Sequence, residues 1–235
     1  MISELLTTWC HDNQIAVTPS QTEAFETYAK LLVSWNEKMN LTAITEEQEI
    51  AVKHFIDSLT VLTCCEIPTD AKLIDIGTGA GFPGIPLTIL RQDIRLTLLD
   101  SLNKRLVFLG EVCQQIGIHA ELLHARAEEY GQKEGYRENY EIAVSRAVAN
   151  LPALCEYCLP YVRTGGRFIA MKGPDGANEL TLAANAIRLL GGKTEDIRTL
   201  TLPDGSERTI IVIRKVSPTP AKYPRRGVKI SKSPL

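Results

Sequence analysis

The chain has 235 residues, of which 44% are hydrophobic and 23% charged, and its formal net charge is −2. This length fits one large domain, or one domain with a small appendage, and the composition provides enough apolar residues for a substantial core. No apolar run approaches the roughly 18 residues that a membrane span needs, and Glu4 stands where a secretion signal has basic residues, so we expect a cytoplasmic protein without membrane contact.

The charges are distributed unevenly. Residues 1–213 hold 19 basic against 28 acidic residues, whereas residues 214–235 hold seven basic residues and no acidic one. A basic tail on an acidic body is typical of proteins that bind nucleic acid, but it is also a common form of solvated terminus, and both interpretations stay open. The seven basic residues are Arg214, Lys215, Lys222, Arg225, Arg226, Lys229 and Lys232.

The residue pattern of the first part of the chain, residues 1–66, predicts helices. A short helix is expected over residues 3–10, and a longer one begins with a predicted capping box from Ser20 to Glu23. A second predicted capping box, Thr45 to Gln48, precedes a helix that ends before Pro68. We expect a helical appendage that packs against a sheet through an apolar stripe. The stripe on the longer helix consists of Phe25, Tyr28, Leu32, Trp35 and Met39.

Two polar residues on the last of these helices, His54 and Asp57, lie three positions apart and are able to touch. A packed or solvated pair is favoured over a catalytic one. The six cysteines lie in segments that look like core, and the C-x-x-C pair Cys155 and Cys158 has helical spacing without a second ligand pair, so we expect packed apolar groups and no metal site.

The stretch from residue 72 to residue 90 predicts a strand, a glycine turn and a helix. The apolar strand ends around Asp75, and glycines alternate at Gly77, Gly79 and Gly81 before an apolar segment of helical spacing. Such a turn brings backbone close to a ligand and points free helix N–H groups at it, so a nucleotide-like molecule is expected here. A dinucleotide fingerprint has a small residue where this chain has Phe82, which counts against NAD.

The pattern D-x-G-x-G-x-G from Asp75 to Gly81 resembles motif I of the class I S-adenosylmethionine-dependent methyltransferases. In those enzymes the strand-end acid lies near the cationic amino-acid end of the cofactor, where opposite charge is favourable. A second predicted strand, residues 95–100, ends in Asp100, a position at which related sheets hold ribose hydroxyls. A helix N-cap is the other interpretation of Asp100, and Ser101 in the same turn is a further candidate contact.

Beyond Asp100 the pattern alternates between helices and strands. Further strands are expected over residues 119–124, 140–145, 166–171, 194–200 and 208–214. Asp204-Gly205 predicts a turn, so the last two strands are expected to be antiparallel. We therefore predict an α/β fold with a Rossmann-like, seven-stranded, mostly parallel sheet, a class I methyltransferase domain over residues 67–215, and a basic tail over residues 216–235.

Polar residues follow three further predicted strands. Arg126, Ala127 and Glu128 stand where a class I methyltransferase reads the adenine; a helix-initiating glutamate is the alternative for Glu128. Arg146 needs an anionic partner, and the cofactor carboxylate or an RNA phosphate would serve. Lys172 precedes Gly173-Pro174 and is expected to face the same cleft. The alternative for Arg146 and Lys172 is that each belongs to a structural ion pair.

The segment after the fourth strand, residues 144–147, bears on the atom that is methylated. It lacks the acid or amide followed by Pro-Pro-aromatic that is common in enzymes methylating exocyclic amines, and it lacks a cysteine nucleophile for carbon-5 of a pyrimidine. With exocyclic amines and carbon-5 of pyrimidines disfavoured, an acceptor atom that already has a lone pair, such as guanine N7, fits the sequence. Alignment and desolvation would then supply catalysis without a general base.

Several segments in one order resemble the RsmG family, also called GidB or glucose-inhibited division protein B. The resemblance rests on WNEKMNLTAIT, HFIDSL, DIGTGAGFPGIPL, LLDSLNKR, ARAEE, SRAVANL, the strand-end MKG and the tail motif YPRR. It implies methylation of N7 of a guanine in the 530 loop of 16S rRNA, on the 30S subunit, with S-adenosylmethionine as cofactor. It further implies cofactor roles for Gly77, Phe82, Ala127, Glu128 and Arg146. Arg126, Arg146 and Lys172 are the candidates for holding RNA or aligning the transfer.

Three other functions stay open at this point. One is a methyltransferase for a small molecule or a protein, for which the basic tail would be unnecessary. Another is a binding module on the small ribosomal subunit that uses S-adenosylmethionine only as a regulatory ligand, and a dehydrogenase is the third. We expect a monomer without a stable protein partner.

Overall fold

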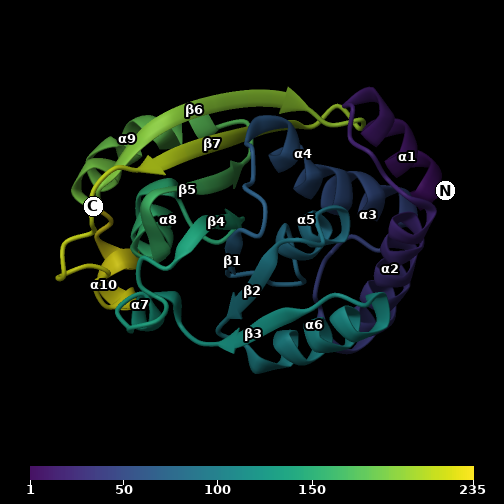
Figure 1. Ribbon diagram of the computed structural model, residues 1–235, viewed down its shortest axis with the longest axis horizontal. Coiled ribbons are helices and arrows are strands. Elements are labelled where there is room, and N and C mark those ends of the chain that lie inside the picture. Colours follow the sequence, from purple (N-terminus) through teal and green to yellow (C-terminus); the bar gives the residue numbers. More distant parts are fainter.

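The computed structural model describes residues 1–235 and contains one seven-stranded sheet with helices on both faces (Figure 1). The strand order is β3-β2-β1-β4-β5-β7-β6. Strands β1 to β5 pair in parallel, and β7 is antiparallel to both β5 and β6. The predicted class I methyltransferase architecture is confirmed, including the antiparallel pair at the end of the chain. The strands are β1 (Lys72–Ile76), β2 (Arg95–Asp100), β3 (Ala120–His124), β4 (Tyr140–Arg146), β5 (Val162–Lys172), β6 (Gly192–Thr201) and β7 (Glu207–Lys215).

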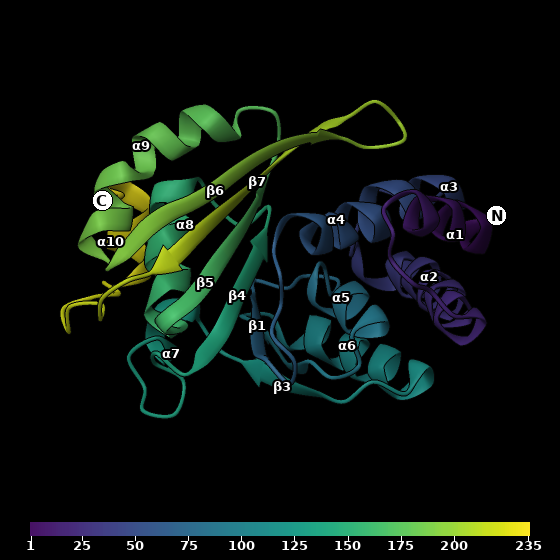
Figure 2. The same ribbon diagram turned by 45° about the horizontal axis from the view of Figure 1, so that its top comes forward.

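The helices form two layers, one on each face of the sheet (Figure 2). The helices of the first layer, with a π-helical turn at Ala51–Ile56 between α3 and α4, are α1 (Ile2–Asp12), α2 (Pro19–Met39), α3 (Glu47–Ile50), α4 (Asp57–Cys64), α5 (Gly84–Leu90) and α6 (Asn103–Ile116). Those of the second are α7 (Ala127–Tyr130), α8 (Leu151–Cys158) with a 3-10 turn at Leu159–Tyr161, α9 (Gly176–Leu189) and α10 (Gly227–Lys232). Each layer has its own buried apolar cluster against the sheet.

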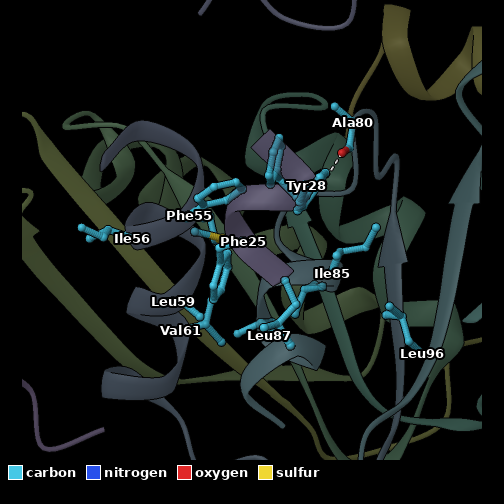
Figure 3. Close-up of a cluster of buried hydrophobic side chains, with 14 of the residues drawn as sticks. Phe25, Tyr28, Phe55, Ile56, Leu59, Val61, Ala80, Ile85, Leu87 and Leu96 are labelled. Carbon is cyan, nitrogen blue, oxygen red and sulfur yellow. Dashed lines mark hydrogen bonds between the residues drawn. The ribbon is translucent and has the colours of Figure 1, made fainter. Parts of the chain in front are cut away.

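The N-terminal helices are part of the core of the protein. Phe25 and Phe55 pack with their ring centroids 4.9 Å apart, and Tyr28 reaches the glycine turn by donating a hydrogen bond to the carbonyl of Ala80 (Figure 3). One continuous cluster joins these rings to Ile85 of α5 and to sheet residues. The predicted packing of the helices against the sheet is confirmed, and the division of the chain at residue 66 stays a prediction.

Both predicted capping boxes are wrong. Helix α2 begins at Pro19, and its capping box joins Thr18 to Gln21, two residues before the predicted one. Proline suits the first helical position because its φ is already helical and the missing N–H has no partner there in any case, so the cap falls on the residue before it. Helix α3 begins at Glu47 after Glu46, without a side-chain cap.

The basic tail, residues 216–235, folds back onto the protein. Ile230 of α10 is fully buried, and the guanidinium of Arg225 lies 2.7 Å from the carboxylate of Glu156, which is itself fully buried on α8. Lys215, where the tail starts, is buried as well, and its Nζ lies 3.1 Å from Glu138 Oε1. The segment is therefore docked through Arg225 and Ile230, while Lys222, Arg226, Lys229 and Lys232 stay exposed, and its binding to RNA stays a prediction.

The six cysteines are buried, with Cys155 and Cys158 fully enclosed on α8. Burial raises the pKa of both thiols well above the ordinary value, as expected for packed apolar groups. No helix is both long and apolar enough to cross a membrane.

Candidate active site

The glycine turn after β1 is held close to two neighbouring segments. The N–H groups of Gly77 and Thr78 both donate to the carbonyl of Leu99 on β2, and Gly77 has a φ of +69°. A Cβ at Gly77 would lie 2.5 Å from Val148 Cγ2, and the positive φ is strained for any residue with a Cβ, so glycine is favoured between this turn and the loop after β4. The turn therefore presents bare backbone to the space above the sheet.

Asp75 shapes this turn from below. Its carboxylate is fully buried, and Oδ2 accepts hydrogen bonds from Thr78 Oγ1 and from the Gly84 N–H, each 2.8 Å long. Oδ1 has no hydrogen-bond partner. Burial raises the pKa of Asp75 to about 6, while the two hydrogen bonds act in the opposite direction. Asp75 lines neither of the two cavities described below, and its carboxylate fixes the backbone of the glycine turn; its expected place near the cationic end of the cofactor stays a prediction.

Asp100 connects the turn to the start of α6. Its Oδ2 accepts from the Gly79 N–H at 3.0 Å and from Arg105 Nη1 at 3.2 Å, and its Oδ1 accepts from the Leu102 N–H at 2.9 Å. Helix α6 begins at Asn103 after Leu102 without a side-chain cap, so the N-cap interpretation of Asp100 is wrong. Asp100 lines a cavity, and its contact with the ribose hydroxyls stays a prediction.

This cavity, the cofactor cavity, lies at the carboxyl ends of the strands and has a volume of about 460 Å³. Six predicted site residues line it, namely Gly77, Asp100, Ser101, Arg126, Ala127 and Glu128. Gly79 does not, although its N–H orients Asp100. Arg105, Val148, Tyr157 and Ser231 also line the cavity, and none of them was predicted from the sequence. Ser231 belongs to the C-terminal helix α10, and nothing local in the sequence signals its place beside the glycine turn.

Arg146 and Lys172 line a second cavity, the acceptor cavity, of about 420 Å³. Arg146 Nη1 lies 2.8 Å from Asp57 Oδ2, and Lys172 Nζ lies 2.8 Å from Glu179 Oε2. These are the structural ion pairs that stood as alternatives for both residues. Arg146 therefore does not face the cofactor cavity, and Arg126, the third candidate for aligning the transfer, is not brought together with the other two.

Phe82 lies in the core between the N-terminal helices and Arg146. Its ring stacks on His54 with the centroids 4.6 Å apart, and the guanidinium carbon of Arg146 lies 4.9 Å above it. Phe82 lines neither cavity, and the cofactor contact expected for it stays a prediction. Its ring instead supports the side chains that form the acceptor cavity.

His54 and Asp57, the pair three positions apart, are both buried and both face Arg146. His54 Nδ1 lies 3.3 Å from Arg146 Nη2, and Nε2 lies 2.9 Å from Thr42 Oγ1. Burial, followed by the charge of Arg146, lowers the pKa of His54 to about 3, so the imidazole is neutral at physiological pH. Asp57 also accepts from Arg208 of β7 at 3.2 Å. No local pattern signals Arg208, because only the fold of β7 brings it here.

Ala147 is the residue at which the two cavities meet. It lines both of them and has a φ of +56°, in the left-handed region that residues with a Cβ seldom adopt. The segment is tied down on both sides: Ser145 Oγ donates to the Ile76 carbonyl at 2.8 Å, and Lys172 Nζ donates to the Ala149 carbonyl at 2.8 Å. The two cavities therefore adjoin at a segment whose backbone is fixed.

Comparison with known proteins agrees with this geometry. The family model described as rRNA small subunit methyltransferase G matches residues 21–211. The chain belongs to this family. It is 52% identical over 223 residues to the ribosomal RNA small subunit methyltransferase G of Desulforamulus reducens, with 93% of this chain and 92% of the relative covered. With the protein of the same name from Clostridium botulinum strain Loch Maree it shares 47% identity over 233 residues, and 98% of each chain is covered.

Solved structures with little sequence identity share the fold. TrmN from Thermus thermophilus superposes with a TM-score of 0.54 at 17% identity, over 68% of this chain and 48% of that one. Precorrin-6y C5,15-methyltransferase from Geobacter metallireducens gives a TM-score of 0.52 at 15% identity, over 67% and 87%. The family member described here is an S-adenosylmethionine-dependent methyltransferase of small-subunit rRNA.

The residues of the cofactor cavity fit S-adenosylmethionine. The cavity combines a turn that disfavours a Cβ at Gly77 with the carboxylate of Asp100, and the uncompensated Oδ1 of Asp75 adds negative charge beneath the turn, where a cationic ligand is favoured. When bound, the cofactor supplies an electrophilic methyl group on its sulfonium. The protein's own contribution is the cavity wall and the fixed segment around Ala147.

Proposed function

We propose that the enzyme transfers the methyl group to N7 of a guanine in the 530 loop of 16S rRNA in the small ribosomal subunit. The observation that carries the proposal is that no side chain of the acceptor cavity is free to remove a proton. Guanine N7 already has a lone pair in the neutral base, so its methylation needs positioning without deprotonation.

Each potential base of the acceptor cavity is engaged. Asp57 is held by Arg146 and Arg208, and Glu179 accepts from Lys172 and, at 2.7 Å, from the Leu151 N–H. His54 has both ring nitrogens in contact with polar groups and a strongly lowered pKa. Acceptors that must lose a proton, such as an exocyclic amine, would find no base here.

The charges of the acceptor cavity suit a nucleic acid. Four cationic residues line it, Lys53, Arg146, Lys172 and Arg208, against the two carboxylates of Asp57 and Glu179. The hydrogen bond to Glu49 raises the pKa of Lys53, which keeps this ammonium charged. With Glu49, the partner of Lys53, included, four cations stand against three carboxylates, and this net positive charge favours a phosphate-bearing acceptor over a neutral small molecule.

Within the cofactor cavity we assign Asp100 to the ribose hydroxyls and Glu128 to the exocyclic amine of the adenine. A carboxylate accepts from two hydroxyls; Asp100 ends β2, Glu128 lies in α7 after β3, and both line the cavity. Ser101, Arg126 and Ala127 complete that wall, and Ala147 marks where the methyl group passes to the acceptor. A monomeric state and a cytoplasmic location stay predictions.

Transfer of labelled methyl groups to unmethylated 30S subunits and to naked 16S rRNA tests the proposal. Borohydride reduction followed by aniline breaks RNA at N7-methylguanine, so the expected result is a single cleavage in the 530 loop, and the better substrate identifies the particle that is recognised. Label in the RNA without cleavage would contradict N7, and absence of label despite bound cofactor would favour a binding module.

A further inference from the structure

The docked C-terminal segment, residues 216–235, forms part of the cofactor cavity, and this suggests a role for it in the choice of cofactor. Ser231 lines the cavity, and Gly227 at the start of α10 packs directly against Glu128, because a Cβ at Gly227 would overlap Glu128 Oε1. Glu128 is the residue assigned to the adenine amine. The segment thus touches the adenine end of the cavity from outside the methyltransferase sheet.

The segment is anchored by contacts that leave little freedom. Arg225 donates to both oxygens of Glu156, from Nε to Oε1 at 2.9 Å and from Nη2 to Oε2 at 2.7 Å, and its backbone N–H donates to Oε1 at 2.8 Å. Arg225 Nη2 also donates to the carbonyl of Ser233 at 3.0 Å, across the length of α10. A two-pronged pair on a fully buried carboxylate fixes both position and orientation.

The approach to α10 is held as well. Arg137 donates to the carbonyls of Thr219 and Tyr223, at 2.7 and 2.8 Å, and Gln132 Nε2 donates to the carbonyl of Pro224 at 3.1 Å. Beyond the anchor, Ile230 is fully buried while its neighbours Lys229 and Lys232 are exposed. Helix α10 therefore points one apolar side chain inward and its two lysines outward.

We propose that Gly227 and the Arg225–Glu156 pair are positioning residues for Glu128, and that the docked C-terminal segment makes the enzyme selective for an adenine with a free exocyclic amine. The segment acts through Glu128 and touches no reacting atom. The inference rests on the proposed contact between Glu128 and adenine. Because cofactor binding is measured without RNA, a negative result would count against this inference and leave the proposed N7 methylation unaffected.

The test compares the binding of two ligands, S-adenosylhomocysteine and its inosine analogue, in which a carbonyl replaces the exocyclic amine. The carboxylate of Glu128 accepts a hydrogen bond from the amine of adenine. In the analogue it faces a carbonyl oxygen, which donates no hydrogen bond, so the native enzyme is expected to bind the adenine form about tenfold more tightly, or more. Calorimetry on the full-length protein gives both dissociation constants.

Gly227→Ala is the sharpest variant, because it displaces the end of the Glu128 side chain and leaves the anchor intact. We expect it to reduce the preference to about twofold, with the melting temperature nearly unchanged. Ile230→Ala, which loosens the docking of α10, is expected to weaken adenine-ligand binding and reduce the preference in the same direction. Glu128→Gln should match Gly227→Ala, since an amide serves adenine and hypoxanthine alike.

Two exposed neighbours provide matched controls. Val228→Ala removes a side chain that is 68% exposed, and Lys229→Ala removes a surface charge on the same helix. Both should retain the native preference, whereas Lys229→Ala is free to change RNA binding. The proposal would be overturned if Gly227→Ala and Ile230→Ala fold and still prefer the adenine ligand as strongly as the native enzyme does. It would also be overturned if the native enzyme bound the two ligands equally well.

Discussion

Arg146 and Asp57 join the end of strand β4 to the first turn of helix α4 across the acceptor cavity, with Nη1 2.8 Å from Oδ2. The side chain of Asp57 is 4% exposed and that of Arg146 is 15% exposed, so the pair is largely removed from water. Because Asp57 also receives Arg208, its loss leaves two guanidinium groups without their anion. A buried charge that loses its partner destabilises the folded state strongly.

Asp57→Ala should therefore lower the free energy of unfolding by about 3 kcal/mol, measured by urea denaturation. Arg208→Ala should cost about 1 kcal/mol, because Asp57 keeps its shorter bond to Arg146 and Arg208 is the more exposed arginine. Equal losses of unfolding free energy in the two variants would show that the ion pair between Asp57 and Arg146 adds no stability beyond that of the pair with Arg208.

Lys172→Met should slow the transfer step much more than it weakens cofactor binding. The substitution removes the hydrogen bond to the Ala149 carbonyl, which fixes the segment between the two cavities. Ala149 also lines the cofactor cavity, but Asp100 keeps all its hydrogen bonds there. Misalignment of this kind costs on the order of 100-fold in rate. Single-turnover kinetics and cofactor titration separate the two effects, and Lys193→Met, at an exposed position of β6, is the control.

Substitutions at Ala147 should separate backbone strain from side-chain volume. Ala147→Val places a β-branched residue at a φ of +56°, which is expected to cost about 2 kcal/mol of stability and to distort the junction of the cavities. Ala147→Gly accepts this φ freely and should retain stability to within about 1 kcal/mol. Thermal denaturation with methyl-transfer assays measures both; a stable, fully active Ala147→Val would contradict the left-handed geometry.

Asp75 should make stability depend on pH in an unusual direction. Its pKa is raised from 3.8 to about 6 in the folded state, so the folded protein binds this proton more tightly than the unfolded chain. The stabilisation from protonation is present below about pH 4 and is lost as the pH rises through about 6, a change on the order of 3 kcal/mol.

In Asp75→Asn this component disappears, because the amide does not titrate and its oxygen still accepts from Thr78 and Gly84. The difference in unfolding free energy between the variant and the native enzyme, measured by urea denaturation from about pH 4 to about pH 7, should therefore grow in favour of the variant. A difference that stays constant across this range would mean that Asp75 has an ordinary pKa.

The parts of the site that the sequence predicted are those built from one short stretch. Asp75, Gly77 and Asp100 lie within a single strand–turn–helix–strand unit, so their spacing already determines that the turn and the strand-end acid meet. Glu128 follows by the same logic at the next strand end.

The parts that the sequence did not predict depend on long-range packing. Arg208 meets Asp57 across 151 positions of the chain, and Arg225 meets Glu156 across 69. Phe82 lies in the glycine motif, yet the N-terminal helices cover it with His54 and Tyr28 and so make it a core residue. The number of basic residues predicted a tail over residues 216–235. It gave no sign that Ile230 is buried or that Arg225 pairs with the buried carboxylate of Glu156.

Alignment in two adjoining cavities, without proton removal, is expected to drive the methyl transfer. Its most direct test is the single-turnover rate on unmethylated 30S subunits as a function of pH. Between about pH 6.5 and about pH 8.5 we expect a rate constant to within about twofold, because the acceptor is neutral guanine and no cavity side chain acts as a base. A rate that rises about tenfold per pH unit in this range would show that a proton must leave before or during the transfer, and would contradict the account.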